Sequence, residues 1–245
     1  MLGSFKNITM MLGLLASTSF AHAEIIIHGT RAIYPADARE ITLQVSNNGD
    51  KPSLVQAWID EGDPKSKPEQ SKAPFIITPP ISRVDPTKSQ SLRITALPNA
   101  KSLSGEQETV FWLNVLDIPP KPKANAQSTE PDNFLQLAIR SRIKLFYRPT
   151  NLKDKVAEAP AKLQWKQVGN QLQVINPTAY HVTITSILSQ QTNGKLVDLM
   201  KEGIMVSPKS SENINLKSAI THSKLSFTTI NDFGGRIQTD LKLNP

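Results

Sequence analysis

The sequence predicts an all-β protein built from two β-sandwich domains, and three observations support this. Short runs of alternating apolar and polar residues recur along the chain, turn residues separate these runs, and no segment has the pattern of a helix of three turns. A charged stretch containing proline, at 150–160, interrupts the series, which resumes beyond it. The 245 residues, 38% of them hydrophobic, provide enough apolar surface for two cores.

The N-terminus has the pattern of a secretory signal peptide at 1–23. Lys6 precedes a short apolar run, 10–20, and the small residues Ala21 and Ala23 predict cleavage after Ala23. A run of about 11 apolar residues is too short to span a bilayer, which requires about 20. We therefore expect an exported chain that is not inserted in a membrane.

The first predicted domain, 24–149, contains a series of short strands. In 41–46, three apolar residues alternate with three polar ones, which predicts a half-buried strand, and the sequence NNGD then predicts a turn. Further strands are predicted at 54–59, 75–78, 92–95, 110–116 and 134–147. The stretch 150–160 is predicted to be a linker between domains because it combines proline with charge.

The second predicted domain, 161–245, repeats this organisation. Its strands are predicted at 163–165, 171–175, 182–187, 195–199 and 224–230.

The segment 134–147 is unusually long for a strand. It has no glycine or proline, whereas strands usually have about 5–6 residues, and at full extension it would reach about 46 Å. Leu135, Leu137 and Ile139 fall on one face of it. Two interpretations remain open: either both ends are buried in the protein's own core, or an exposed edge pairs with a strand of another chain.

Composition and motifs argue against a catalytic site, a metal or a cofactor. The chain has no cysteine, no recognisable nucleophile, zinc or phosphate-loop motif, and only scattered histidines after the signal peptide, at 28, 181 and 222. The neighbouring acids Asp60 and Glu61 fall in a predicted loop, where we expect solvated charges. The net charge of +7 is spread over the chain without clustered aromatic residues, which argues against a nucleic-acid partner.

Six segments together resemble a known family. In order, they are GTRAIYP at 29–35, VQAWID at 55–60, PFIITPP at 74–80, FWLNV at 111–115, IKLFYRP at 143–149 and NDFGGR at 231–236. Their order and spacing resemble those of the periplasmic chaperones of the chaperone–usher pilus pathway. This resemblance implies two immunoglobulin-like domains with an interdomain cleft. It also implies a protein that lends a strand to newly exported pilus subunits and delivers them to an outer-membrane usher.

The resemblance also implies roles for individual residues. Arg31 and Lys144 would bind the C-terminal carboxylate of the subunit, while Leu135, Leu137 and Ile139 would enter the subunit's groove. The remaining matched residues, which would form a charge network between the domains, are Glu108, Arg148 and Asp232. The segment before Glu108, LSGEQE, departs from the family pattern because it lacks the usual Pro, Asp and Arg.

The lack of cysteine favours the short-loop type of these chaperones, with a modest insertion at 121–133 that leaves the start and register of the donated strand open. The main alternative from another functional class is a structural pilin or adhesin subunit of the fibre. An exported enzyme with an unrecognised site is a third. Whether the free protein covers its exposed strand by self-association is also left open.

Overall fold

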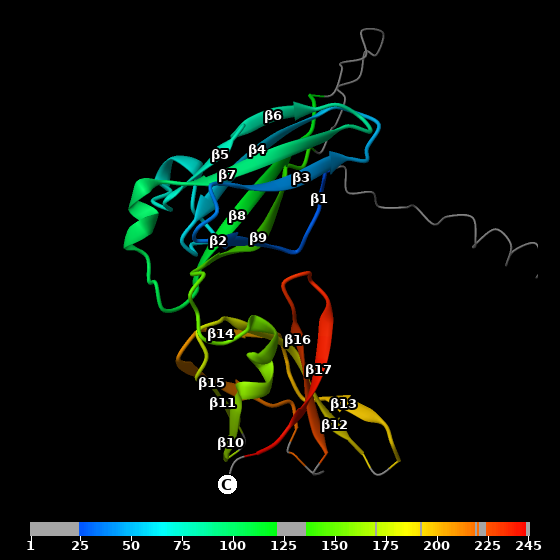
Figure 1. The fold of residues 1–245 in the computed structure, drawn as a ribbon. Helices are drawn as coiled ribbons and strands as arrows, with labels where there is room; N and C mark the ends of the chain where they lie inside the picture. Colours follow the sequence, from blue (N-terminus) through cyan, green and yellow to red (C-terminus); the bar gives the residue numbers. More distant parts are fainter. Residues whose placement is uncertain are drawn as a thin grey trace, which may run out of the picture.

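The structure is a computed structural model that describes residues 25–121, 136–169, 171–191, 193–218, 220 and 224–243. Two β-sandwiches follow one another along the chain (Figure 1). The described residues contain 17 strands, four short 3-10 helices and no α-helix, so the all-β prediction is confirmed. No helix in these ranges has the length and hydrophobicity required to cross a membrane.

Several expectations lie outside the described residues. They are the signal peptide 1–23 with its cleavage after Ala23, the predicted groove residue Leu135, most of the insertion 121–133, and His222.

The N-terminal sandwich packs a four-stranded sheet on a five-stranded sheet. The first sheet has the order β1 (Ile25–Ile27), β3 (Ile41–Asn47), β7 (Ser89–Ala96) and β5 (Phe75–Thr78). The second has the order β2 (Arg31–Pro35), β9 (Ile139–Arg148), β8 (Thr109–Ile118), β4 (Ser53–Asp60) and β6 (Ile81–Val84). The 3-10 helices η1 (Pro68–Gln70) and η2 (Pro98–Ser102) lie in its loops.

Alternating side chains from both sheets fill the core of this sandwich. Leu92 of β7, Leu113 of β8 and Leu145 of β9 are completely buried. Tyr34 of β2 is also buried and meets the ring of Phe75 edge-on, with 5.4 Å between the ring centroids. The strands that carry the candidate site are therefore fixed by a continuous apolar core.

The C-terminal sandwich has the same two-layer construction. One sheet has the order β10 (Gln164–Val168), β11 (Gln171–Asn176) and β15 (Ser210–Asn215). The other has the order β13 (Leu196–Asp198), β12 (Val182–Gln190), β16 (Leu225–Ile230) and β17 (Arg236–Leu241), and β14 (Ile204–Val206) also pairs with β12. Trp165 and Phe227, with ring centroids 5.0 Å apart, lie in its core.

The segment between the sandwiches is attached to the second one. It contains η3 (Val156–Glu158) and is followed by η4 (Pro160–Lys162). Leu152 and Val156 pack against the C-terminal core, and Ala159 is part of it. Much of the predicted linker 150–160 therefore rests on the C-terminal sandwich.

The predicted strand 134–147 is shorter in the structure. β9 begins at Ile139, and 136–138 are described without strand structure. The ladder between β8 and β9 ends where Asp117 lies opposite Ile139, one residue before the end of β8. Residues 136–138 have no neighbouring strand in their own sheet among the described residues, so an apolar pattern alone did not fix the start of the strand.

Candidate functional site

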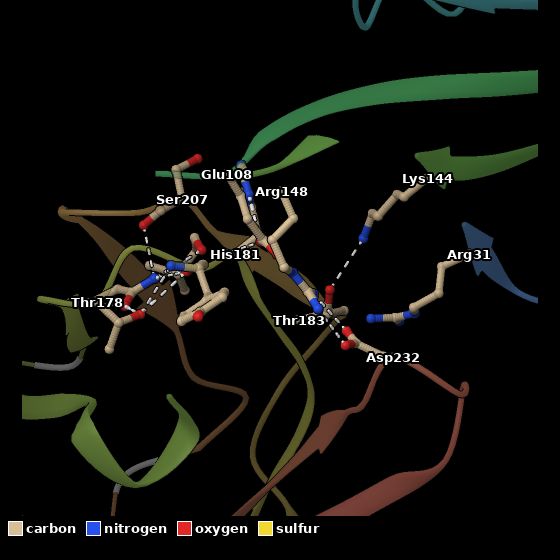
Figure 2. Close-up of polar contacts among 12 residues, drawn as sticks. Arg31, Glu108, Lys144, Arg148, Thr178, His181, Thr183, Ser207 and Asp232 are labelled. Carbon is tan, nitrogen blue, oxygen red and sulfur yellow. Dashed lines mark hydrogen bonds and ion pairs between the residues drawn. The ribbon is translucent and has the colours of Figure 1, made fainter. Parts of the chain in front are cut away.

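The two predicted anchor residues, Arg31 and Lys144, lie side by side on neighbouring strands. The parallel register of β2 with β9 places Arg31, the first residue of β2, opposite Lys144. Lys144 Nζ donates a hydrogen bond to Thr183 Oγ1 at 3.4 Å (Figure 2). Arg31 Nη1 donates one to the carbonyl oxygen of Ile230 at 3.1 Å. Both cations therefore lie at the junction of the two sandwiches.

Neither of these cations has a carboxylate within ion-pair distance in the part of the chain that the structure describes. Burial, followed by the nearby charge of Arg31, lowers the pKa of Lys144 to about 8. Burial also lowers the pKa of Arg31, against the opposing effects of Asp232 and Glu108. The buried Nε of Arg31 has no hydrogen-bond partner among the described residues. Two adjacent, partly desolvated cations with unused donors form a site that an anion would stabilise.

The residues of the predicted charge network, Glu108, Arg148 and Asp232, lie together at the same junction. Arg148 donates from Nε to Glu108 Oε1 at 2.6 Å, and from Nη1 and Nη2 to the two oxygens of Asp232 at 2.6 and 2.8 Å. Although burial opposes its charge, the hydrogen bonds to Asp232 and the charge of Glu108 raise the pKa of Arg148. Because Arg148 ends β9 and Asp232 follows β16, this arginine connects the two sandwiches (Figure 2).

His181 also belongs to this junction, although the sequence analysis assigned it no role. Its backbone N–H donates to Glu108 Oε2 at 2.8 Å, and its ring lies 5.5 Å from that of Phe146. The imidazole is packed rather than available as a ligand, since its side chain is only 5% exposed.

The turn between β16 and β17 holds Asp232 in position. The side-chain oxygen of Asn231 accepts hydrogen bonds from the backbone N–H groups of Phe233 and Gly235. Gly234 has a φ of +83°, and a Cβ there would lie 2.6 Å from Thr30 Oγ1. The glycine therefore lets the turn approach the residue that precedes β2.

β9 carries exposed apolar side chains past the end of the core. Leu145 is completely buried and Ile143 packs against the same core, whereas Ile139, at the start of β9, and Leu137, two residues before it, are 55% and 62% exposed. This exposure matches the second interpretation of the long segment, in which its edge remains available to another chain.

The edge of β9 that faces away from β8 is only half paired. β8 pairs with 139–147, but β2 pairs only with 144–148. Residues 139–143 therefore have no strand partner on the β2 side within the described residues, and the vacant position lies in line with β2, ahead of Arg31.

Asp60 corrects one sequence-based expectation. It was expected to be a solvated charge, but its side chain is only 1% exposed. Its Oδ1 accepts hydrogen bonds from Arg142 Nη2 at 2.6 Å and from the Gly62 N–H, and its Oδ2 accepts one from Asn114 Nδ2. Burial raises its pKa, but the hydrogen bonds from Arg142 and Asn114 outweigh this and lower it. Asp60 is the last residue of β4 and lies on the same face as Trp58. Its position two residues after a tryptophan in a predicted strand was the sequence signal that its side chain would be covered.

The described residues contain no group of three His, Cys, Asp or Glu side chains that could hold a metal ion. A small cavity between the sandwiches is lined by both of them, among its residues Arg31, Phe146, Arg148, His181 and Asp232. The candidate site is thus an interdomain anion site next to a free strand edge.

Both sandwiches match family models. Residues 24–153 match the N-terminal domain of the PapD-type pili and flagellar-assembly chaperones, and 158–241 match the C-terminal domain of the PapD pili assembly chaperones. The curated chaperone protein MrkB of Klebsiella pneumoniae is 44% identical over 219 residues, which cover 89% of this chain and 91% of that protein.

Solved structures give the same result. The CupB2 chaperone of Pseudomonas aeruginosa is 37% identical with a TM-score of 0.73, and the match covers 89% of this chain and 100% of that one. The SafB chaperone of Salmonella enterica, solved in complex with the SafA pilin, is 27% identical with a TM-score of 0.72. That match covers 91% of this chain and 99% of the other.

Proposed function

The chain belongs to the PapD-like family of pilus-assembly chaperones, and we propose that it captures pilus subunits by adding the free edge of β9 to their incomplete fold. It is a non-enzymatic, periplasmic type of chaperone with two immunoglobulin-like domains, as the resemblance implied. Because chaperone models match both halves, the alternatives of a fibre subunit and an exported enzyme lose their support.

One observation carries the proposed mechanism: among the described residues, a strand edge without a partner, next to exposed apolar side chains, ends at two cations that have no carboxylate within ion-pair distance. The edge at 139–143 offers backbone hydrogen bonds, and Leu137 and Ile139 offer apolar surface. A pilus subunit that lacks its last strand needs both, because its open sheet and exposed core would otherwise aggregate. By the family resemblance, Leu135 would contribute a third side chain.

The position of the cations predicts the direction of the added strand. Arg31 and Lys144 lie at the end of the free edge toward which β9 runs. A subunit strand whose C-terminal carboxylate binds there must run in the same direction as β9, in line with β2. Arg31 suits a carboxylate because its planar guanidinium has several donors, and Lys144 adds a second charge. The carboxylate would fix the register of the added strand.

The charge network has a different proposed role. Glu108, Arg148 and Asp232 are already satisfied by one another, so we assign them to holding the two sandwiches in a fixed orientation. This orientation keeps Arg31 and Lys144 at the end of the free edge of β9, where its pairing with β2 begins.

The remaining assignments follow from the sequence and the family. We propose cleavage after Ala23 and domains at 24–149 and 161–245, with the connection 150–160 resting on the second domain. The lack of cysteine supports the short-loop type, and the loaded chaperone would deliver its subunit to an outer-membrane usher.

Co-expression with a candidate pilus subunit tests the proposal. We expect a stable 1:1 complex in the periplasm, and we expect Arg31→Ala and Lys144→Ala to abolish its recovery. Arg83→Ala is the matched control, because Arg83 is an exposed arginine of the same sheet that forms an exposed ion pair with Asp85. Complex yields that are equal for all four proteins would refute the carboxylate-anchor role.

A further inference from the structure

Lys144 shares one face of its sheet with a cluster of polar and aromatic residues that the proposed function does not use. The registers of β9, β8 and β4 place Lys144 opposite Trp112, and Trp112 opposite Asp60. Arg142 lies two residues before Lys144 on β9, and therefore on the same face. We call Asp60, Trp112 and Arg142 the Trp112 cluster.

Arg142 is held between the other two members of the cluster. Its Nη2 donates to Asp60 Oδ1 at 2.6 Å, and its guanidinium lies 4.2 Å from the centroid of the Trp112 ring. Both charges of the ion pair are largely shielded from water, since the side chains of Asp60 and Arg142 are 1% and 17% exposed. A stacked arginine whose charge is paired in this way fixes the plane of the ring beneath it.

The ring of Trp112 also faces the ammonium group of Lys144, which lies 5.6 Å from the ring centroid. The polar contact of Lys144 is the long hydrogen bond to Thr183, at 3.4 Å. Arg31 on β2 and Arg142 on β9 are two further charged groups near it, and Asp60 forms an ion pair with the second. The charges of Asp232 and Glu108 stabilise the charged form of Arg31. The π face of Trp112 is therefore the electron-rich surface against which the ammonium rests.

We propose that Trp112 is a positioning residue that orients Lys144 for the incoming carboxylate, and that Asp60 and Arg142 hold the Trp112 ring in place. Asp60 has a second effect, because it cancels the charge of Arg142 that would otherwise repel Lys144. A lysine that is already oriented loses less conformational freedom when the subunit binds. This inference rests on the proposed function for the identity of the ligand, but not for the state of Lys144 in the free protein.

Lysine titration in the free chaperone tests the first half of the proposal. With lysine labelled at Cε, NMR reports the pKa of Lys144, and the Lys144→Arg spectrum assigns its signal. Trp112→Leu removes the π face that stabilises the charged ammonium, so the pKa of Lys144 should fall. Trp112→Phe should largely restore it. Asp60→Asn should also lower it by leaving Arg142 unpaired, whereas Asp85→Asn, which breaks an exposed pair near the same sheet, should leave it unchanged.

Subunit affinity tests the second half. We expect Trp112→Leu to weaken binding of a subunit that the wild-type protein captures by roughly threefold, the scale of one exposed cation–π contact. Trp112→Phe should recover most of this loss. Folded Trp112→Leu and Asp60→Asn proteins with unchanged Lys144 titration would overturn the proposal. A shifted titration with unchanged affinity would overturn the preorganisation role. If the wild-type protein captured no subunit, the proposed function would fail, while the titration would still decide the positioning of Lys144.

Discussion

The charged residues at the junction of the two sandwiches differ in whether a partner satisfies them. Arg148 has two carboxylates and an elevated pKa, so its charge is permanent. Lys144 is half-buried beside Arg31, with no carboxylate within ion-pair distance among the described residues, and its pKa is lowered to about 8. A charged residue that is already paired with carboxylates stabilises the folded structure, whereas a cation without a carboxylate gains the most stabilisation when an anion binds.

The lowered pKa of Lys144 predicts that subunit binding weakens at alkaline pH. A bound carboxylate favours the charged ammonium and raises its pKa in the complex, so the complex retains the proton that the free protein loses as pH rises above about 8. Linkage then predicts a constant dissociation constant below this pH and a rise of up to about tenfold per pH unit above it. Calorimetric or fluorescence titration with purified subunit measures this profile.

Lys144→Arg is the control for this prediction, because an arginine stays charged throughout the range. Its binding profile should be flat where that of the wild type rises. If both proteins lost affinity in parallel, another group would be responsible.

Gly234 predicts a stability effect that arises from backbone geometry. Gly234→Ala places a Cβ at a φ of +83° and only 2.6 Å from Thr30 Oγ1, so we expect a loss of about 1–2 kcal/mol in the free energy of unfolding. Gly105→Ala is the matched control, since its Cβ would meet no atom within 4 Å. Urea denaturation measures both changes, and equal values for the two variants would contradict this explanation.

At the scale of elements, β9 combines a buried half and an exposed half in one strand. Leu145 is completely buried in the N-terminal core, while Ile139 is 55% exposed beyond it. Substitutions in the two halves should therefore affect different properties: stability in the first and subunit capture in the second.

Ile139→Asp tests the exposed half. We expect little change in unfolding free energy but a loss of affinity for the subunit of roughly 30-fold or more, the scale of a binding hot spot. Ile81→Asp is a close control, because Ile81 is 52% exposed on β6, at the other edge of the same sheet. Surface plasmon resonance with immobilised subunit compares the variants. A similar loss in both would point to a general effect of the added charge rather than to the edge of β9.

The sequence predicted most strands because alternation of apolar residues reports directly on a half-buried surface, as in β3. It did not predict the start of β9, because that depends on where β8 ends. It also missed the burial of Asp60, whose partner Arg142 lies 82 residues away and meets it only through the sheet. The family resemblance drew attention to Arg31 and Lys144, but only the structure showed that neither has a carboxylate within ion-pair distance in the described part of the chain.

For the whole molecule, the decisive quantity is the orientation of the two sandwiches. Arg31 and Lys144 come from the first sandwich, but their hydrogen-bond partners Ile230 and Thr183 come from the second. If the sandwiches moved apart, the cations would lose these contacts and their burial. The anion site therefore exists only while the interdomain contacts hold.

Asp232→Asn tests this dependence. The aspartate is 24% exposed and its contact with Arg148 is bidentate, so we expect the free energy of unfolding to fall by about 1 kcal/mol, the upper end of the range for exposed ion pairs. Its bidentate contact with Arg148 also holds the turn between β16 and β17 against the first sandwich, so we expect a wider distribution of interdomain orientations. Small-angle X-ray scattering and residual dipolar couplings measure this distribution.

The control is Asp240→Asn, an exposed carboxylate on β17 away from the junction. Because a looser junction leaves Lys144 more hydrated, its pKa should rise toward that of a free lysine in Asp232→Asn and stay at about 8 in the control. An unchanged orientation with a changed pKa would assign Asp232 a direct electrostatic effect instead.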